Sequence, residues 1–208
     1  MTSTFRTEHA PTVPAPPAVR SLRPWFGLMV LGGGLGMISA GWQTVERIRW
    51  AAKPTASSFC EINSVLSCSS VYSHWQSSAL GIPNSIIALA VFGFAASAGL
   101  AGLLGSALSS RYLASVFGVT VFMTAFVTWY LEQSALSIRV LCLFCVACAV
   151  NIILVGVGVT RVASTEGALG QGRIGRGVGA LVDSGADLVV WAGLAALLGT
   201  MLWLGLTL

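Results

Sequence analysis

Five long apolar runs constrain this chain of 208 residues more than any other feature of its sequence. A helix needs about 20 mainly apolar residues to cross the hydrocarbon core of a bilayer. Each run has about that length, so we predict five membrane-spanning helices. Their expected positions are 24–44, 84–105, 112–131, 140–159 and 188–206. The sequence therefore predicts an all-α protein whose main partner is the lipid bilayer.

The scarcity of charged residues supports lipid as the surrounding solvent. Charged residues make up 9% of the chain and hydrophobic residues 55%, whereas about a quarter of a typical soluble domain is charged. The net charge of +4 is small and comes from few residues. We attribute it to membrane orientation and headgroup contact rather than to nucleic-acid binding.

Composition divides the chain into four segments. Residues 1–23 contain closely spaced prolines and no apolar run, so we expect a disordered tail and no signal peptide. Residues 24–161 contain four of the apolar runs, together with a long loop at 45–83. A glycine-rich polar linker is expected at 162–187, and the fifth helix at 188–208.

The basic residues indicate the orientation, because Lys and Arg are more frequent in cytoplasmic loops. With the N-terminus in the cytoplasm, seven basic residues lie inside and four outside. The tail and the linker are then cytoplasmic, and loop 45–83 faces the oxidising side, where disulfides persist. The inner seven are Arg6, Arg20, Arg23, Arg111, Arg161, Arg173 and Arg176, and the outer four are Arg47, Arg49, Lys53 and Arg139.

Four of the five cysteines form two closely spaced pairs. Cys60 and Cys68 lie in the long loop, and Cys142 and Cys145 form a CxxC motif at the start of the fourth run. Positions i and i+3 share one face of a helix, so the two CxxC sulfurs can meet. A helix N-terminus also favours a thiolate. The two pairs together favour thiol–disulfide exchange over a static structural disulfide.

Two local helix starts can be predicted beside these cysteines. Ser137 is expected to cap the fourth helix, which would place Cys142 near the outer water boundary and Cys145 one turn deeper. Ser67 is expected to cap a short helix that begins near Cys68. The residues Val71, Tyr72 and Trp75 would give this short helix an apolar face for the membrane surface.

Other uses of the cysteines must be weighed. A CxxC motif can be half of a metal site, but the chain has only two histidines, His9 and His74, and His9 lies in the tail on the opposite side. We therefore expect no metal. Cys148 would lie about 9 Å deeper than Cys142 along the helix, and we interpret it as an apolar packing residue.

The order and spacing of these motifs resemble the vitamin K epoxide reductase family over roughly residues 25–160. The resemblance implies a four-helix transmembrane bundle around a quinone at the outer leaflet. It also implies a short extracytoplasmic half-helix over the site, with the fifth helix peripheral to the bundle. The motifs are Cys60, seven residues and Cys68-Ser69-Ser70-Val71, then Gly81-Ile82-Pro83-Asn84-Ser85-Ile86, and finally Cys142-x-x-Cys145.

The resemblance also implies roles for individual residues. Cys60 matches the cysteine that meets the protein substrate, Cys68 the one that exchanges with Cys142, and Cys145 the one that faces the quinone. Asn84 matches an asparagine that hydrogen-bonds a quinone oxygen, although an asparagine there could instead cap the second helix. His74 stands where the family often has serine. It could contact the quinone or accept a thiol proton, or be an exposed histidine without a role.

These roles predict a thiol:quinone oxidoreductase in the bacterial cytoplasmic (inner) membrane, with its active site on the extracytoplasmic side. It would reoxidise a separate thioredoxin-fold partner and reduce ubiquinone or menaquinone. The chain ends after its fifth run, so we expect the bacterial type without a fused thioredoxin-like domain. One alternative is quinone-epoxide reduction. The vertebrate enzymes of the family carry a tyrosine about one turn after the CxxC motif, and its absence from residues 146–149 counts against this alternative. The other is a non-enzymatic scaffold or metal-binding protein.

Overall fold

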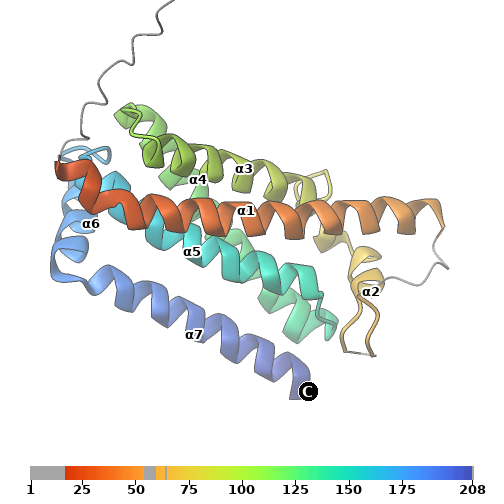
Figure 1. Ribbon diagram of the computed structural model, residues 1–208. Coiled ribbons are helices and arrows are strands. Elements are labelled where there is room, and N and C mark those ends of the chain that lie inside the picture. The colour runs from red at the N-terminus through yellow and green to blue at the C-terminus, as the bar shows by residue number, and fades with distance from the viewer. Residues whose placement is uncertain (1–16, 54–59, 64, 208) are drawn as a thin grey trace, which may run out of the picture.

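A computed structural model describes residues 17–53, 60–63 and 65–207. Over these residues the chain is almost entirely helical, and the extended pairing within them is one parallel bridge between Leu66 and Leu141. Five of the described helices are long and apolar enough to cross a membrane, and Figure 1 shows them side by side. The predicted all-α membrane fold is confirmed.

The five long helices agree with the five predicted apolar runs, and several extend beyond them. α1 begins seven residues before the expected start at residue 24, so residues 17–23 are helical rather than part of the tail. A proline is well tolerated in the first helical turn, and the residues after Pro17 favour a helix. The remaining tail, 1–16, lies outside the described residues. The helices are α1 Pro17–Ala52, α3 Asn84–Leu103, α4 Ser110–Glu132, α5 Leu143–Thr165 and α7 Ala186–Thr207.

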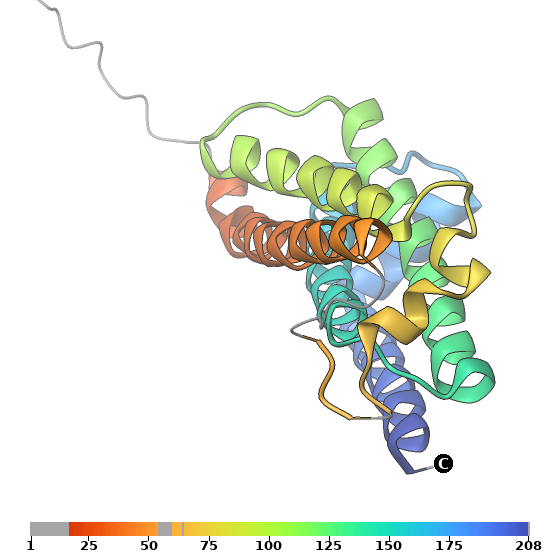
Figure 2. The same cartoon turned by 90° about the vertical axis from the view of Figure 1, so that its right-hand side faces the viewer.

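Small residues allow the helices of the bundle to pack closely. A Cβ atom added to Gly32 would lie 2.9 Å from the backbone oxygen of Asn151 on α5, and one added to Gly33 would lie 2.8 Å from the Cβ of Ala96 on α3. The two glycines therefore leave no room for a side chain, and small residues that allow helices to approach closely are a common basis of helix association in membranes. α1 therefore packs between α3 and α5 (Figure 2).

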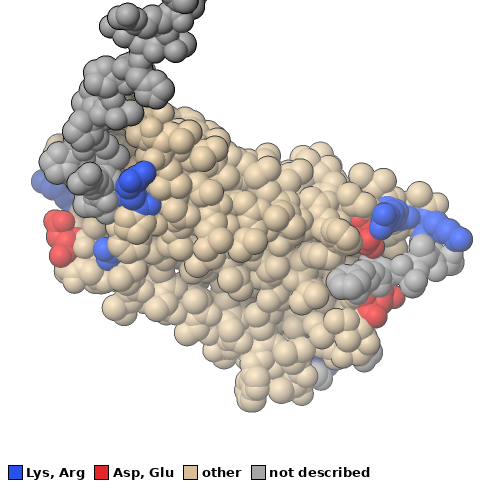
Figure 3. All heavy atoms as spheres, viewed as in Figure 1, with Lys and Arg blue, Asp and Glu red and all other residues tan. Residues whose placement is uncertain are grey.

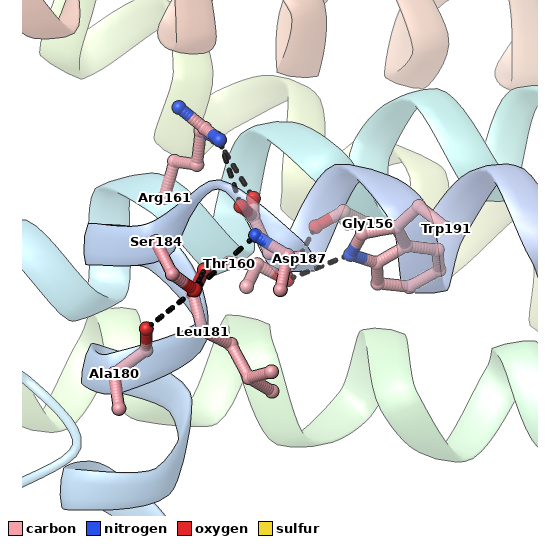
Figure 4. A network of polar contacts seen from close by, with 9 residues as sticks. Gly156, Thr160, Arg161, Ala180, Leu181, Ser184, Asp187 and Trp191 are labelled. Atoms are coloured by element: carbon pink, nitrogen blue, oxygen red, sulfur yellow. Dashed lines mark hydrogen bonds and ion pairs between the residues drawn. The ribbon is translucent and has the colours of Figure 1, made fainter.

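α7 is peripheral to the other four long helices, as predicted. Its most apolar window is 17% buried, compared with 56% for α5. A polar cluster near its start joins it to α5 (Figure 4). Arg161 donates two hydrogen bonds, of 2.8 and 2.7 Å, to the carboxylate of Asp187, and Trp191 donates one of 3.3 Å to Thr160. This paired charge fixes one end of an otherwise loosely packed helix.

The segment predicted as a polar linker contains a further helix, α6 (Arg173–Ser184). Its apolar residues recur at helical spacing, with Ile174, Val178, Leu181 and Val182 toward one side. Figure 1 shows α6 at the end of the bundle, next to the start of α7. The many glycines of this segment obscured the helical period, because glycine has a low intrinsic helix propensity.

Charged side chains gather at the two ends of the molecule and leave an uncharged band between them (Figure 3). One end carries the start of α1, the turn between α3 and α4, and α6. The other carries the end of α1, the short helix α2 (Cys68–Tyr72) and the connection from α4 to α5 (Figure 1). Both cysteine pairs therefore lie at the same end of the bundle.

Candidate active site

The half-helix α2 follows Cys60 in the loop and begins at Cys68, as predicted. Ser67 is its N-cap, and the Ser67 hydroxyl accepts a 3.3 Å hydrogen bond from the backbone N–H of Ser70. The prediction that its apolar face meets the membrane surface is wrong for two of the three residues. Val71 and Tyr72 are buried against the bundle, whereas Trp75 is 68% exposed. The end of the bundle supplies the apolar surface that α2 covers.

Backbone hydrogen bonds join the loop to the segment before the CxxC motif. The N–H of Leu141 donates to the carbonyl of Val65 at 2.7 Å, and the N–H of Ser67 donates to the carbonyl of Leu141 at 3.1 Å. These two bonds form the parallel bridge and fix the register of the two segments. Because Cys142 directly follows Leu141 and Cys68 comes two residues after Leu66, the bridge places the two cysteines close together.

The sulfur atoms confirm this placement. Cys60 and Cys68 form a disulfide with their Cα atoms 5.5 Å apart. The Sγ of Cys142 lies 3.0 Å from the Sγ of Cys68, and the three sulfurs all lie within 4.8 Å of one another. All three residues are buried. A thiolate at Cys142 could attack the loop disulfide directly at Cys68, and the same geometry serves the reverse reaction.

The fourth membrane helix begins later than predicted. Its N-cap is Cys142 rather than Ser137, which lies in a π-helical turn, Gln133–Ile138, that continues α4. That turn is closed by a hydrogen bond of 3.1 Å from the N–H of Val140 to the carbonyl of Ser134. α4 is therefore too long for Ser137 to start the next helix. The Cys142 thiol still lies at the helix N-terminus, and Cys145 lies in its first turn.

Two polar side chains from other helices contact the Cys145 thiol. Gln43 of α1 donates its amide N–H to the Cys145 Sγ at 3.1 Å and to the Cys142 Sγ at 3.6 Å. Tyr130 of α4 hydrogen-bonds to Cys145 through its hydroxyl. Donors directed at a sulfur stabilise a thiolate there. Both residues were missed in the sequence, although polar side chains inside a membrane span are a signal of function.

A small cavity lies beside Cys145, with about 50 Å³ of space open to the centre of a water molecule. Its wall is mainly apolar, with a few polar groups, as is usual for small-molecule sites. Residues from all four helices of the bundle and from α2 contribute to it. They include Gln43, Arg47, Tyr72, Asn84, Tyr130 and Cys145.

The structure separates the two candidate quinone contacts, Asn84 and His74. Asn84 lines the cavity and does not cap α3, whose N-cap is Pro83. Its amide N–H donates to the carbonyl of Gln76 at 2.7 Å, and its side-chain oxygen is buried with no partner among the described residues. His74 is exposed, with its Nδ1 2.8 Å from the carbonyl of Ser70, and it does not line this cavity. Asn84 thus lines the cavity, whereas His74 lies outside it.

The comparison with known families agrees with this geometry. The family model described as Vitamin K epoxide reductase family matches residues 27–160. The chain belongs to this family. The match includes both cysteine pairs, the half-helix and the four helices of the bundle, and it ends before α6 and α7. No curated protein sequence matches the chain. Members of the vitamin K epoxide reductase family are membrane oxidoreductases, so the cysteine arrangement is that of a redox site.

Arg47 joins α1 to the segment that covers the site. Its guanidinium donates to the hydroxyls of Ser77 and Ser78, at 2.6 and 3.1 Å, in the short helix η1 (Trp75–Ser78). The same group lies 5.3 Å from the centre of the Tyr72 ring. A cation over an aromatic face is attracted to it. This one side chain therefore holds both α2 and η1 over the cavity.

Cys148 is expected to be dispensable for activity. It packs in the bundle core and borders the deep end of the cavity, but it lies outside the group of three close sulfurs. Cys148→Ala should retain wild-type turnover, at a stability cost of about 1 kcal/mol for the lost core atoms. Thiol-dependent quinone reduction and thermal unfolding of the purified variant measure both effects. An inactive Cys148→Ala protein that folds normally would show that the deeper CxxC, Cys145 to Cys148, is the active one.

Proposed function

We propose that this protein oxidises the thiols of a separate extracytoplasmic thioredoxin-fold protein and passes the electrons to a membrane quinone. One observation carries the proposal. The CxxC motif contacts the loop disulfide on one side, with 3.0 Å between the Cys142 and Cys68 sulfurs, and borders an apolar cavity on the other, through Cys145. A thiol donor on the water side and a lipid-soluble electron acceptor can therefore both react with the Cys142 and Cys145 pair.

The first step is an exchange between the partner and the loop. A thiolate of the partner attacks Cys60, which breaks the Cys60–Cys68 disulfide and releases Cys68 as a thiolate. The second thiol of the partner then displaces Cys60, and the partner leaves in its oxidised form. Cys60 is buried while the loop disulfide is formed. Because thiol–disulfide exchange requires access to the sulfur, the loop must move to admit the partner.

The second step moves the electrons to the CxxC motif. The Cys68 thiolate attacks Cys142 of a Cys142–Cys145 disulfide, forms a Cys68–Cys142 bond and releases Cys145. Cys60 then attacks Cys68, which restores the loop disulfide and releases Cys142. Each transfer breaks one S–S bond and forms another. The contact of 3.0 Å between the Cys68 and Cys142 sulfurs needs little rearrangement for this exchange.

The third step oxidises the CxxC pair. Two electrons pass from the reduced pair to a quinone in the cavity, two protons complete the quinol, and the Cys142–Cys145 disulfide forms again. Gln43 and Tyr130 would stabilise the Cys145 thiolate by hydrogen bonds before this transfer. Ubiquinone and menaquinone both present two carbonyl oxygens and an apolar ring, which match the polar groups and the apolar wall of this cavity.

Quinol formation by the purified protein tests this proposal. The protein is mixed with a reduced thioredoxin-fold protein and a short-chain quinone, and the quinone absorbance is followed. We expect one quinol for each partner disulfide formed. Consumption of partner thiols without quinol, or no reaction with either ubiquinone or menaquinone analogues, would contradict the proposed function.

Quinone-epoxide reduction is the second candidate, because of one observation. The sequence lacks a tyrosine just after the CxxC motif, but Tyr130 of α4 places a phenol beside Cys145. Opening an epoxide requires an acid that protonates its oxygen, and a phenol can supply that proton. Vitamin K epoxide offered with a dithiol reductant separates the two candidates, since only the second predicts its consumption.

The proposed orientation also predicts which side the loop faces. In intact cells treated with a reductant, a membrane-impermeant thiol reagent should label Cys60 and Cys68, because the loop faces outward. A cysteine placed at Ser3, in the tail, should be labelled only after the membrane is opened. Peptide mass spectrometry reads both results in one sample. Labelling of the loop only after lysis would reverse the proposed topology.

A further inference from the structure

The cavity beside Cys145 contains polar atoms whose hydrogen bonds are not satisfied by the protein. Among the described residues, three buried side-chain atoms have no partner: the Tyr72 hydroxyl, the Asn84 side-chain oxygen and the Gln76 side-chain oxygen. Tyr72 and Asn84 line the cavity. A buried polar atom without a partner costs about 1–3 kcal/mol. Such atoms at a cavity wall therefore point to a ligand that would pair with them.

The chemical type of these atoms limits what the ligand can be. One N–H of the Asn84 amide donates to the carbonyl of Gln76, at 2.7 Å. This bond orients the amide so that an acceptor, its oxygen, remains free. Of the three atoms, only the Tyr72 hydroxyl can donate. A ligand that arrives with carbonyl oxygens and no donor, as a quinone does, can therefore pair with Tyr72 but not with the free oxygen of Asn84.

The position of Tyr72 is fixed before any ligand arrives. Its ring is 4% exposed and makes an edge contact with Trp50, with 6.1 Å between the ring centres. The guanidinium of Arg47 lies over the same ring. Burial raises the pKa of the Tyr72 hydroxyl well above its usual range, so it stays protonated and able to donate at neutral pH. A donor held in place this way needs no reorganisation to bind.

We propose that the Tyr72 hydroxyl donates the hydrogen bond that holds a quinone carbonyl oxygen in this cavity, with the Asn84 oxygen accepting from the hydroxyl of the quinol. This inference rests on the proposed function and names the groups that distinguish substrate from product. As two electrons pass from the CxxC pair, charge grows on the carbonyl oxygen, and the Tyr72 bond strengthens. Protonation then gives the quinol an O–H, which the Asn84 oxygen can accept.

Tyr130 does not fill this role, because its hydroxyl is already hydrogen-bonded to the Cys145 thiol. The two tyrosines therefore have different roles. Tyr130 acts on the sulfur that gives up electrons, whereas Tyr72 acts on the oxygen that receives charge. The sequence placed Tyr72 at the membrane surface, and only its burial in the structure assigns it to the cavity.

The variant Tyr72→Phe tests the proposal, since it removes the hydroxyl and keeps the ring against Trp50 and Arg47. With ubiquinone-1 as the acceptor, we expect kcat/KM for the quinone to fall about tenfold, the loss of one hydrogen bond to a buried oxygen. Reduction of the loop disulfide by the partner, measured without quinone, should be unchanged. Tyr112→Phe is the matched control, because its hydroxyl bonds Ser97 at 3.0 Å and does not line the cavity.

The outcomes separate this inference from the proposed function. Equal quinone kinetics in wild type and Tyr72→Phe would overturn the role of Tyr72 and leave the thiol:quinone activity standing. A loss of both the quinone and the thiol reactions in Tyr72→Phe would also overturn it, because the ring would then act only by holding α2. Wild-type protein that forms no quinol from ubiquinone-1 or menadione would overturn both.

Discussion

Replacing Cys142 or Cys145 with alanine is expected to abolish quinol formation. Cys142 contacts the loop disulfide at 3.0 Å, and Cys145 borders the cavity. No other described sulfur bridges those two positions. Each residue carries a covalent step that no neighbour can replace, so turnover should fall by about 10³-fold or more. Quinol formation with a reduced thioredoxin-fold partner measures this loss.

Two controls make this first prediction specific. Cys148→Ala removes a buried sulfur from the same helix and should stay active, so a general loss of packing can be distinguished from a loss of chemistry. Cys145→Ser keeps the size of the side chain and should be as inactive as Cys145→Ala, because a serine hydroxyl cannot form the disulfide. Substantial quinol formation by either CxxC variant would show that electrons reach the quinone by another route.

The parts of the site that the sequence predicts are those with a local signature. Two short cysteine spacings and their order in the chain predict the two pairs that the structure brings to one end of the bundle, and a serine before Cys68 was enough to place the start of α2. Local hydrogen bonds decide these features, so neighbouring residues reveal them. The five membrane helices follow in the same way from runs of apolar residues.

The parts that were missed depend on contacts between distant segments. Gln43 lies 102 positions before Cys145, and no local pattern connects them. Tyr130 lies on α4 beside Cys145, whereas a tyrosine was sought in the sequence only at 146–149, just after the CxxC motif. Tyr72 was assigned to the membrane surface because an apolar face on a short helix cannot show whether lipid or protein will cover it. Ser137 was misplaced as a cap because the π-helical turn extends α4 beyond its apolar run.

The role of the glycine-rich segment 162–187 was also decided by tertiary structure. The residues of α6 alternate between glycine and larger side chains, so composition alone indicated a linker. In the structure this segment joins α5 to α7 and brings Asp187 to Arg161, with 2.7 Å between their closest charged atoms. A partly buried pair of this kind, in which Asp187 is fully buried, is costly to break. It explains how a helix outside the matched family region stays attached to the bundle.

The variant Cys145→Ala should accumulate a disulfide between Cys68 and Cys142, with Cys60 left as a free thiol. Removing a resolving thiol traps the mixed disulfide of an exchange step, because no second sulfur remains to release it. In this variant the Cys142 thiolate attacks Cys68 of the loop disulfide and displaces Cys60. The 3.0 Å contact between the Cys142 and Cys68 sulfurs favours this attack over one at Cys60.

Non-reducing gels and mass spectrometry of the trapped peptides identify the bond. Cys60→Ala combined with Cys145→Ala leaves Cys68 and Cys142 as two thiols, which an added thiol oxidant such as diamide should join in a disulfide, because their sulfurs lie 3.0 Å apart. The complementary variant Cys68→Ala keeps only Cys60 in the loop, which should be found bonded to the thioredoxin-fold partner. The three sulfurs lie within 4.8 Å of one another, so the opposite order is within reach. A Cys60–Cys142 bond in Cys145→Ala, with Cys68 free, would therefore reverse the roles of the two loop cysteines and refute the relay proposed for this site.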